Sequence, residues 1–363
     1  MRRMLSVPWT LAVPPFALFA LVLSWGRELP TVPAIIVAAV LAAAVLAAVH
    51  HAEVVAHRVG EPFGSLVLAV AVTVIEVALI VSMMASGGAK TATLARDTVF
   101  SAVMITCTGI VGLTLLIATM RRRVAMFNAE GTGGALATVA TLATLTLVLP
   151  TFTTSEPGAS FSTAQLAFAA VASLTLYGLF VLTQTVRHRD YFLPMRADGS
   201  VVTTEDHAAA PTTRATMTSL GLLLLALVTV VGLAKVESPV IESAVARADL
   251  PPSVVGVVIA LLVLLPETLA AARAARRDRV QTSLNLALGS AMASIGLTIP
   301  AIAVASIWLD GPLTLGLGAT HMVLLALTVA VTTLTVVPGR ATLLQGGVHL
   351  VLFAAFLFLA ISP

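Results

Sequence analysis

Charged residues are scarce in this sequence: they make up 10% of its 363 residues, whereas 58% are hydrophobic and the mean hydropathy is +1.03. A soluble globular protein would carry about 25% charged residues. Long apolar stretches separated by short polar breaks recur along the whole chain, a pattern typical of a polytopic helical membrane protein. The stretches do not alternate apolar and polar residues as the strands of an outer-membrane barrel do. The sequence therefore predicts an all-α polytopic membrane protein.

Cysteine is nearly absent, and common metal-binding and nucleotide-binding motifs are missing. The single cysteine, Cys107, lies in an apolar segment and cannot form an intrachain disulfide. The sequence has no cysteine or histidine cluster that would hold a softer metal, and no G-x-x-x-x-G-K-[ST] loop for ATP-driven pumping. A resident cofactor is therefore not expected.

Basic residues raise the isoelectric point to about 9.6, but they cluster in the breaks between apolar stretches. In that position they orient a protein in the bilayer, so a nucleic-acid partner is not expected. The triplet Arg121–Arg123 is interpreted as a topology anchor that contacts anionic membrane lipid. The N-terminal stretch resembles a signal peptide but has no small-x-small cleavage site, so it is interpreted as an uncleaved first helix.

The apolar stretches predict eleven transmembrane helices, each about long enough to cross a ~30 Å hydrocarbon core. They cover residues 10–26, 32–50, 63–86, 97–120, 133–150, 162–186, 215–235, 252–272, 281–306, 312–336 and 340–361. A leading helix (residues 1–31) precedes two sets of five (32–187 and 215–363), which a polar cytoplasmic linker (188–214) joins. Because five is odd, two homologous halves would insert in opposite orientations, as in the inverted repeats of many secondary transporters.

The distribution of basic residues predicts the orientation. With a cytoplasmic N-terminus and an outer C-terminus, only five of the 20 basic residues fall in outer segments; these are Arg27, Lys90, Arg96, Lys235 and Arg247. The other 15 lie inside, as the positive-inside rule requires. The expected location is the bacterial inner membrane.

Two glutamates stand apart from the other acidic residues. Of the 17 acidic residues, only Glu76 and Glu267 are expected well inside helices. Each belongs to the second helix of its half, so the two positions correspond under the inverted repeat and lie near the midplane. One buried glutamate alone could be a protonated packing residue, but two at symmetry-related positions favour a functional site.

Small polar residues follow each glutamate in the next helix. Ser101, Thr108 and Gly112 share a helical face, and Ser283, Ser290 and Ser294 repeat that spacing. Hydroxyl oxygens there could complete an ion site near the two carboxylates, which are the expected metal ligands. Close helix packing explains any single one of these small residues equally well.

Two carboxylates at one midplane site suggest a mechanism. At ~5 Å separation they would repel by ~3 kcal/mol at an effective dielectric near 20, or about two pKa units. Either protons or a cation must neutralise them, and the two compete for the same oxygens. Pro266 lacks an N–H and frees a carbonyl one turn earlier, either as part of a discontinuous helix or as a simple kink. Competitive occupancy with alternating access is proton/cation antiport.

Two longer motifs carry a family resemblance. "AHRVGEPFGSLVLAVAVTVIEVALIVSMM" with "LARDTVF", and "LPETLAAARAARRDRVQTSLNLALGSAMASIGLTIP", resemble the two α-repeats of the cation/proton exchanger branch of the calcium/cation antiporter superfamily. Within it the chain most resembles the bacterial calcium–sodium/potassium–proton antiporter type. The resemblance implies that Glu76 and Glu267 bind the cation and exchange it for protons.

The sequence departs from the eukaryotic-like members of this family at several side chains. The Gly-Asn pairs that precede the glutamates there are Val72-Thr73 and Val263-Leu264 here, although Thr73 keeps a hydroxyl one turn from Glu76. Thr108 replaces an asparagine, and Ala293 replaces a glutamine after Gly289-Ser290. Fewer side-chain oxygens remain, so Na⁺ or K⁺ is an alternative or additional substrate to Ca²⁺.

Further ionisable residues have weaker assignments. Glu53, His57 and Glu61, with His50 and His51, surround the cytoplasmic end of the helices before Glu76 and could relay protons or cations, although an ordinary interfacial loop is favoured. Glu205-Asp206-His207 in the linker is interpreted as solvated chain rather than a pH or Ca²⁺ sensor.

The sequence therefore predicts a secondary antiporter, not an enzyme. It would export Ca²⁺, and Na⁺ or K⁺ as additional substrates, in exchange for protons. A Na⁺(K⁺)/H⁺ antiporter with little Ca²⁺ activity is the first alternative, and a passive cation channel using the same acidic site is the second. An intramembrane hydrolase is disfavoured because no aspartate is expected well inside a helix.

Overall fold

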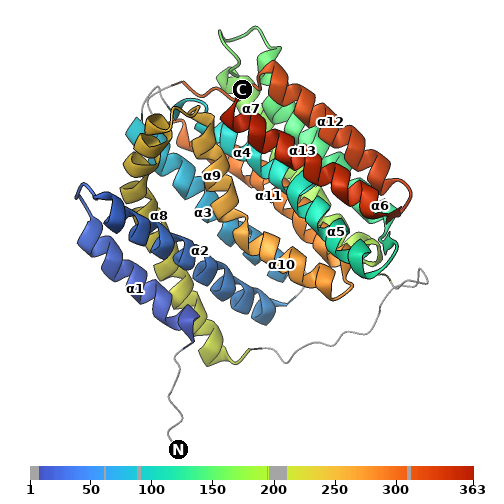
Figure 1. Ribbon diagram of the computed structural model, residues 1–363, viewed down its shortest axis with the longest axis horizontal. Helices are drawn as coiled ribbons and strands as arrows, with labels where there is room; N and C mark the ends of the chain where they lie inside the picture. The colour runs from blue at the N-terminus through green and yellow to red at the C-terminus, as the bar shows by residue number, and fades with distance from the viewer. Residues whose placement is uncertain (1–7, 61–62, 88–90, 194, 196–210, 309–311) are drawn as a thin grey trace, which may run out of the picture. The chain divides into compact units, whose positions relative to one another are not determined.

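The computed structural model describes residues 8–60, 63–87, 91–193, 195, 211–308 and 312–363. Apart from one two-residue strand pair, their regular structure is helical, which confirms the all-α prediction. The helices are α1 (Trp9–Ser24), α2 (Thr31–Val59), α3 (Phe63–Gly87), α4 (Leu94–Met104), α5 (Val111–Arg121), α6 (Ala129–Ala143), α7 (Thr163–Leu182), α8 (Thr213–Arg247), α9 (Ser253–Val263), α10 (Leu265–Arg276), α11 (Val280–Ala305), α12 (Ala319–Val336) and α13 (Leu343–Ile361). Figure 1 shows their order along the chain. Glu61 and Glu205-Asp206-His207 lie outside the described residues.

Membrane crossings are identified by helix length and apolar composition. Among the described residues, eight helical segments qualify alone, and α9 with α10 forms a ninth that bends by 50°. Helix α1 and the stretch Val70–Ala85 of α3 are apolar but shorter. The protein is therefore a polytopic membrane protein, but the predicted number of eleven crossings is not confirmed.

The chain forms two compact units. The first contains Met1–Met83 and His207–Ala248, and the second contains Met84–Asp206 and Asp249–Pro363. Both units combine segments from the beginning and the later part of the sequence. The boundaries of the two five-helix repeats stay a prediction.

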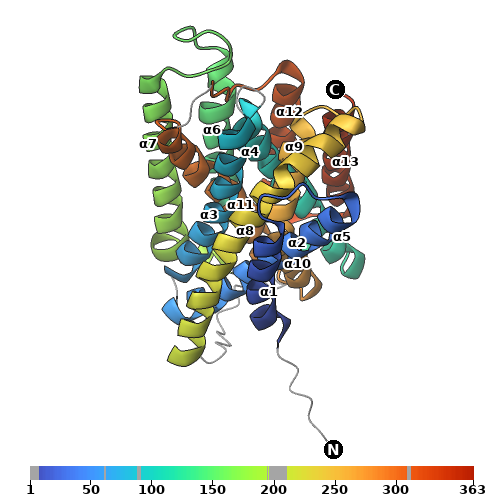
Figure 2. The same cartoon turned by 90° about the vertical axis from the view of Figure 1, so that its left-hand side faces the viewer.

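In the first unit, α1, α2 and α8 pack side by side (Figures 1 and 2). Arg58 near the end of α2 donates to the Thr213 hydroxyl at the start of α8, 3.2 Å away, so the two helices are antiparallel. Both helices are longer than predicted: α2 continues past residue 50 to Val59, and α8 past residue 235 to Arg247. Glutamate and arginine in these added segments are good helix formers, and Pro239 does not end α8.

In the second unit, α11 packs against α6, α7 and α10, and α5 packs against α13. The latter pair approaches closely because glycines face the other helix. A Cβ on Gly112 would lie 3.0 Å from the backbone nitrogen of Leu350, and one on Gly346 would lie 2.9 Å from that of Leu116. Small residues thus let apolar helices pack without a hydrophobic driving force between them.

A two-residue antiparallel ladder joins β1 (Ala125–Met126) to β2 (Arg340–Ala341) in the same unit. It ties the segment after α5 to the turn between α12 and α13. The sequence did not predict it, because two residues carry too little alternation to mark a strand.

The stretch before α12 is not helical, which corrects the predicted helix over 312–336. Residues 312–318 are irregular, and α12 begins only at Ala319. The sequence here contains a proline and two glycines, which disfavour a helix. Its amides bond instead to carbonyls of other segments: Gly316 to Ala159 and Leu317 to Leu147, both at 2.8 Å.

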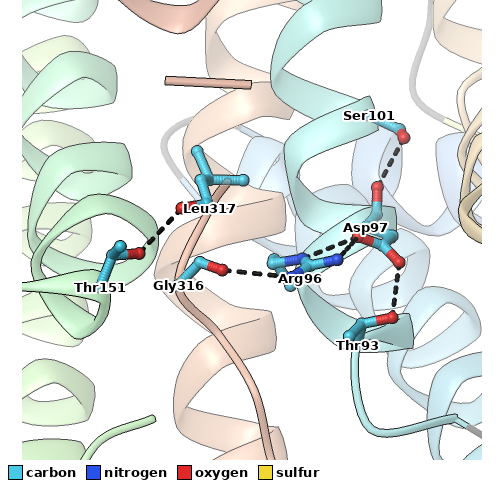
Figure 3. Close-up of polar contacts among 7 residues, drawn as sticks. All are labelled: Thr93, Arg96, Asp97, Ser101, Thr151, Gly316 and Leu317. Atoms are coloured by element: carbon cyan, nitrogen blue, oxygen red, sulfur yellow. Dashed lines mark hydrogen bonds and ion pairs between the residues drawn. The ribbon is translucent and has the colours of Figure 1, made fainter. Parts of the chain in front are cut away.

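An ion pair at the start of α4 holds this irregular stretch (Figure 3). The guanidinium of Arg96 lies 2.8 Å from the Asp97 carboxylate and also donates to the Gly316 carbonyl at 3.2 Å. The Thr93 hydroxyl donates to the other Asp97 oxygen at 2.8 Å. Thr151 donates to the Leu317 carbonyl at 2.9 Å. Side chains from two sides thus fix the segment that leads into α12.

Neutralising Asp97 should therefore loosen this part of the second unit. The Asp97→Asn variant leaves the largely buried Arg96 without its anion, and we expect a loss of about 1–3 kcal/mol in stability. Thermal unfolding of the purified protein in detergent measures it. The matched control is Asp278→Asn, whose ion pair with Arg122 is exposed and should contribute little. Equal effects of the two variants would contradict a specific role of the Arg96–Asp97 pair.

Candidate ion-binding site

Glu76 lies on the buried face of α3. Its side chain is only 2% exposed, and Thr73, one turn earlier, is 6% exposed. Ile80 and Met83 continue this face at helical spacing, whereas Val74 is exposed. The hydroxyl of Thr73 and the carboxylate of Glu76 are therefore neighbours on one buried side of the helix.

Glu267 lies beside a break in the span that the sequence predicted as one helix over 252–272, close to Pro266, the predicted position of a helix break or kink. Helix α9 ends at Val263, α10 begins at Leu265, and the two axes differ by 50°. Pro266 occupies the first turn of α10, where its missing N–H costs no hydrogen bond. Glu267 follows it, also in the first turn. A carboxylate at a helix N-terminus faces the positive end of the helix dipole.

The two glutamates thus have different backbone surroundings. Helix α3 is continuous through Glu76, whereas the second-half helix is interrupted next to Glu267. Glu76 belongs to the first compact unit and Glu267 to the second. A site shared by both carboxylates stays a prediction.

Thr108 lies in a π-helical segment, Ile105–Ile110, between α4 and α5. Its fully buried hydroxyl donates to the carbonyl of Met104. Such wide turns inside α-helices are frequent at functional sites, because they leave some carbonyls without their usual amide partner. The carbonyl of Cys107, in the same segment, accepts from Nδ1 of His349 on α13 at 2.9 Å. The π-segment therefore supplies backbone oxygens as well as the Thr108 hydroxyl.

The serines predicted to line the site divide into two groups. Ser101 donates to the Asp97 carbonyl at 2.5 Å, and Ser283 to the Ala271 carbonyl of α10 at 2.7 Å, so both serve helix structure and packing. Ser290 is partly buried and Ser294 is 3% exposed, on the same face of α11. These two remain candidates for ion ligands.

The predicted relay residues lie on a helix rather than in a loop. Glu53 and His57 are exposed on one side of α2, four residues apart. His51 is buried: its Nε2 lies 2.9 Å from the Thr10 carbonyl and its Nδ1 lies 3.2 Å from the Ser219 hydroxyl. His51 therefore ties α2 to α1 and α8 and has a structural role.

Sequence reasoning missed one buried carboxylate. Glu237 was placed in an outer loop, but α8 continues through it and its side chain is only 2% exposed. The helix was predicted to end at residue 235, before Glu237. The spacing of buried residues from Leu223 to Glu237 would have indicated a continuing helical face.

The sequence is similar to known proteins over nearly its whole length. Residues 29–186 and 218–362 match the model of the sodium/calcium exchanger protein family. The chain is 44% identical to y4hA of Sinorhizobium fredii over 369 residues, covering 99% of this chain and 98% of that protein. It is 35% identical to the sodium-potassium/proton antiporter ChaA of Escherichia coli over 352 residues, covering 96% and 94%.

The fold is similar to that of a solved exchanger. The crystal structure of the H⁺/Ca²⁺ exchanger CAX superposes with a TM-score of 0.71 at 18% identity, covering 96% of this chain and 87% of that one. The resemblance first drawn from the two glutamate motifs is therefore confirmed. This protein belongs to the sodium/calcium exchanger family and is a membrane transporter of cations, not an enzyme.

Proposed function

We propose that this transporter is a secondary antiporter that exports Ca²⁺, Na⁺ or K⁺ in exchange for protons, by alternating access at a site that Glu76 and Glu267 share. The observation that carries the proposal is the placement of Glu76, a carboxylate 2% exposed on a helix with no other charged residue. The relationship to ChaA, a sodium-potassium/proton antiporter, supports proton coupling.

The mechanism follows from the cost of charge in an apolar surrounding. A carboxylate at membrane depth costs a few kcal/mol even on the lenient insertion scale. Glu76 is stable there when a proton or a cation neutralises it, and a cation that binds must displace the proton. Because each substrate excludes the other, an alternating-access cycle returns protons when it expels cations.

Glu267 would contribute the second carboxylate. Pro266, just after the break between α9 and α10, has no N–H to donate to a carbonyl at the end of α9, and interrupted helices of this kind coordinate ions in other transporters. Together with the hydroxyls of Thr73, Thr108, Ser290 and Ser294, these oxygens form the proposed coordination shell. Hard oxygen ligands suit Ca²⁺, Na⁺ and K⁺.

The identity of the cation depends on the number of ligands. Ca²⁺ takes six to eight oxygens, and two carboxylates supply at most four. Thr73 and Thr108 offer only single hydroxyls, so water and backbone carbonyls would complete a Ca²⁺ shell. CAX is named as an H⁺/Ca²⁺ exchanger and ChaA as a sodium-potassium/proton antiporter, so relatives point to both classes of ion.

The proposed location is the bacterial inner membrane, with the N-terminus in the cytoplasm and the C-terminus outside. The excess of basic residues in the segments assigned to the inside supports this orientation. Protons flowing inward would then drive the export of cations.

Neutralising either glutamate should abolish exchange. In everted membrane vesicles, Glu76→Gln and Glu267→Gln are each expected to reduce cation-dependent proton flux to background, because glutamine binds neither a proton nor a cation in exchange. The matched control is Glu130→Gln, which changes an exposed carboxylate at the start of α6 and should leave the flux intact. Flux retained by both site variants would exclude the two-glutamate mechanism.

An ion panel should separate the substrate classes. Adding Ca²⁺, Na⁺, K⁺ or Mg²⁺ in turn to energised vesicles, across a range of pH, should release protons with Ca²⁺, Na⁺ or K⁺. Mg²⁺ should be ineffective, because it demands octahedral geometry and gives up its water reluctantly. Dissipation of a cation gradient without proton movement, at every pH, would instead identify a passive cation channel.

A further inference from the structure

Glu237 is a buried carboxylate that the proposed mechanism does not use. It lies in α8, is 2% exposed, and its Oε1 is enclosed with no hydrogen-bond partner among the described residues. The next residue, Ser238, donates to Glu242 at 3.0 Å and so does not serve Glu237. Buried polar side chains nearly always have a partner, so this one requires an explanation.

The alignment of α2 with α8 in the first unit shows where Glu237 lies. Ser219 contacts His51 of α2, and Glu237 follows Ser219 by five full turns, so it faces the same side ~27 Å further along α8. Helices α2 and α8 are antiparallel, as the Arg58–Thr213 bond shows. Glu237 is therefore near the beginning of α2, at the end of the helix pair remote from His51.

Aromatic and basic side chains near Glu237 indicate that this part of α8 lies at a membrane–water interface. A Cβ on Gly232 would meet Leu21 near the end of α1, so α1 ends beside this part of α8. The ammonium of Lys235 lies 5.6 Å from the ring centre of Trp25. Tryptophan and lysine favour the headgroup region. Glu237 is thus buried in protein at about the depth where water begins.

Among the described residues of the first unit, the helices near Glu237 supply no counter-charge beside it. Helix α1 has no ionisable side chain, α2 has none before His50, and the described part of α3 carries only Glu76. Arg27 and Glu28, between α1 and α2, are exposed. On α8, Lys235 is exposed over Trp25, about 200° around the helix from Glu237, and Glu242 is bonded to Ser238.

We propose that Glu237 is a third proton-binding carboxyl of the exchanger, which takes up and releases a proton at the end of α8 remote from His51. Because Oε1 is enclosed with no hydrogen-bond donor or cation from the described residues, the side chain is stable as the neutral acid. When water reaches that end of the helix, the ionised form becomes favourable and the proton leaves. On the predicted topology this end faces outward, so the group reports the pH of the outer medium.

The proposal rests on proton-coupled exchange as proposed above, but its test does not require transport. Protonated carboxyls have an infrared carbonyl stretch that ionised carboxylates lack. Purified wild-type protein at neutral pH should show such a band, and the difference spectrum between wild type and Glu237→Gln should contain it. The control is Glu242→Gln, whose carboxylate is partly exposed and already hydrogen-bonded, and which should leave the band unchanged.

Transport then tests the role of the proton. In proteoliposomes, Glu237→Gln should retain exchange but shift its midpoint with outer pH by about one unit or more, and Glu237→Asp should restore the wild-type profile. An infrared band that Glu237→Gln leaves intact, or that Glu242→Gln also removes, would overturn the proposal, as would an unchanged pH profile. Failure of the two-glutamate mechanism would appear separately, as full exchange in Glu76→Gln and Glu267→Gln.

Discussion

The cost of placing a carboxylate in an apolar surrounding is the constraint on which this transporter depends. Charged groups make up a tenth of the chain, and most of those in the described residues lie at helix ends or between helices. Glu76 breaks that pattern on a helix with no other charged residue. Burial makes the ionised form unfavourable unless a partner neutralises it. The same penalty would destabilise an ordinary membrane helix. In an exchanger, it favours replacing one bound positive charge with another.

The local backbone supports this chemistry in two ways. The break before Glu267 and the π-helical segment at Thr108 both remove regular amide-to-carbonyl bonds at membrane depth. Irregular backbone is tolerated there only when it is buried in protein or lines a polar path. Elsewhere in the second unit, the irregular stretch before α12 has its carbonyls hydrogen-bonded by Arg96, which Asp97 pairs with, and by Thr151 (Figure 3). The helices are thus irregular at two positions of the proposed ion site, whereas the irregular stretch before α12 is compensated by hydrogen bonds.

Much of the fold could be predicted because apolar runs of membrane length carry a strong signal. The approximate positions of most helices and the family follow from the sequence, whereas the site formed by the two glutamates stays a prediction. The errors arise where local composition and tertiary context disagree. Histidines and arginines suggested that α2 ended near residue 50, but His51 is held by Thr10 and Ser219. Helix α8 was predicted to end at residue 235, yet it continues past Glu237. The apolar run before α12 is irregular because its amides bond to other segments. Local sequence patterns do not predict such hydrogen bonds between distant segments.

Competition between proton and cation is the central claim, and a binding measurement tests it most directly. Adding Ca²⁺, Na⁺ or K⁺ to purified protein in weakly buffered detergent solution should release protons. That release should be lost in the double variant Glu76→Gln/Glu267→Gln. Cation binding by the wild type without any release of protons would contradict the account.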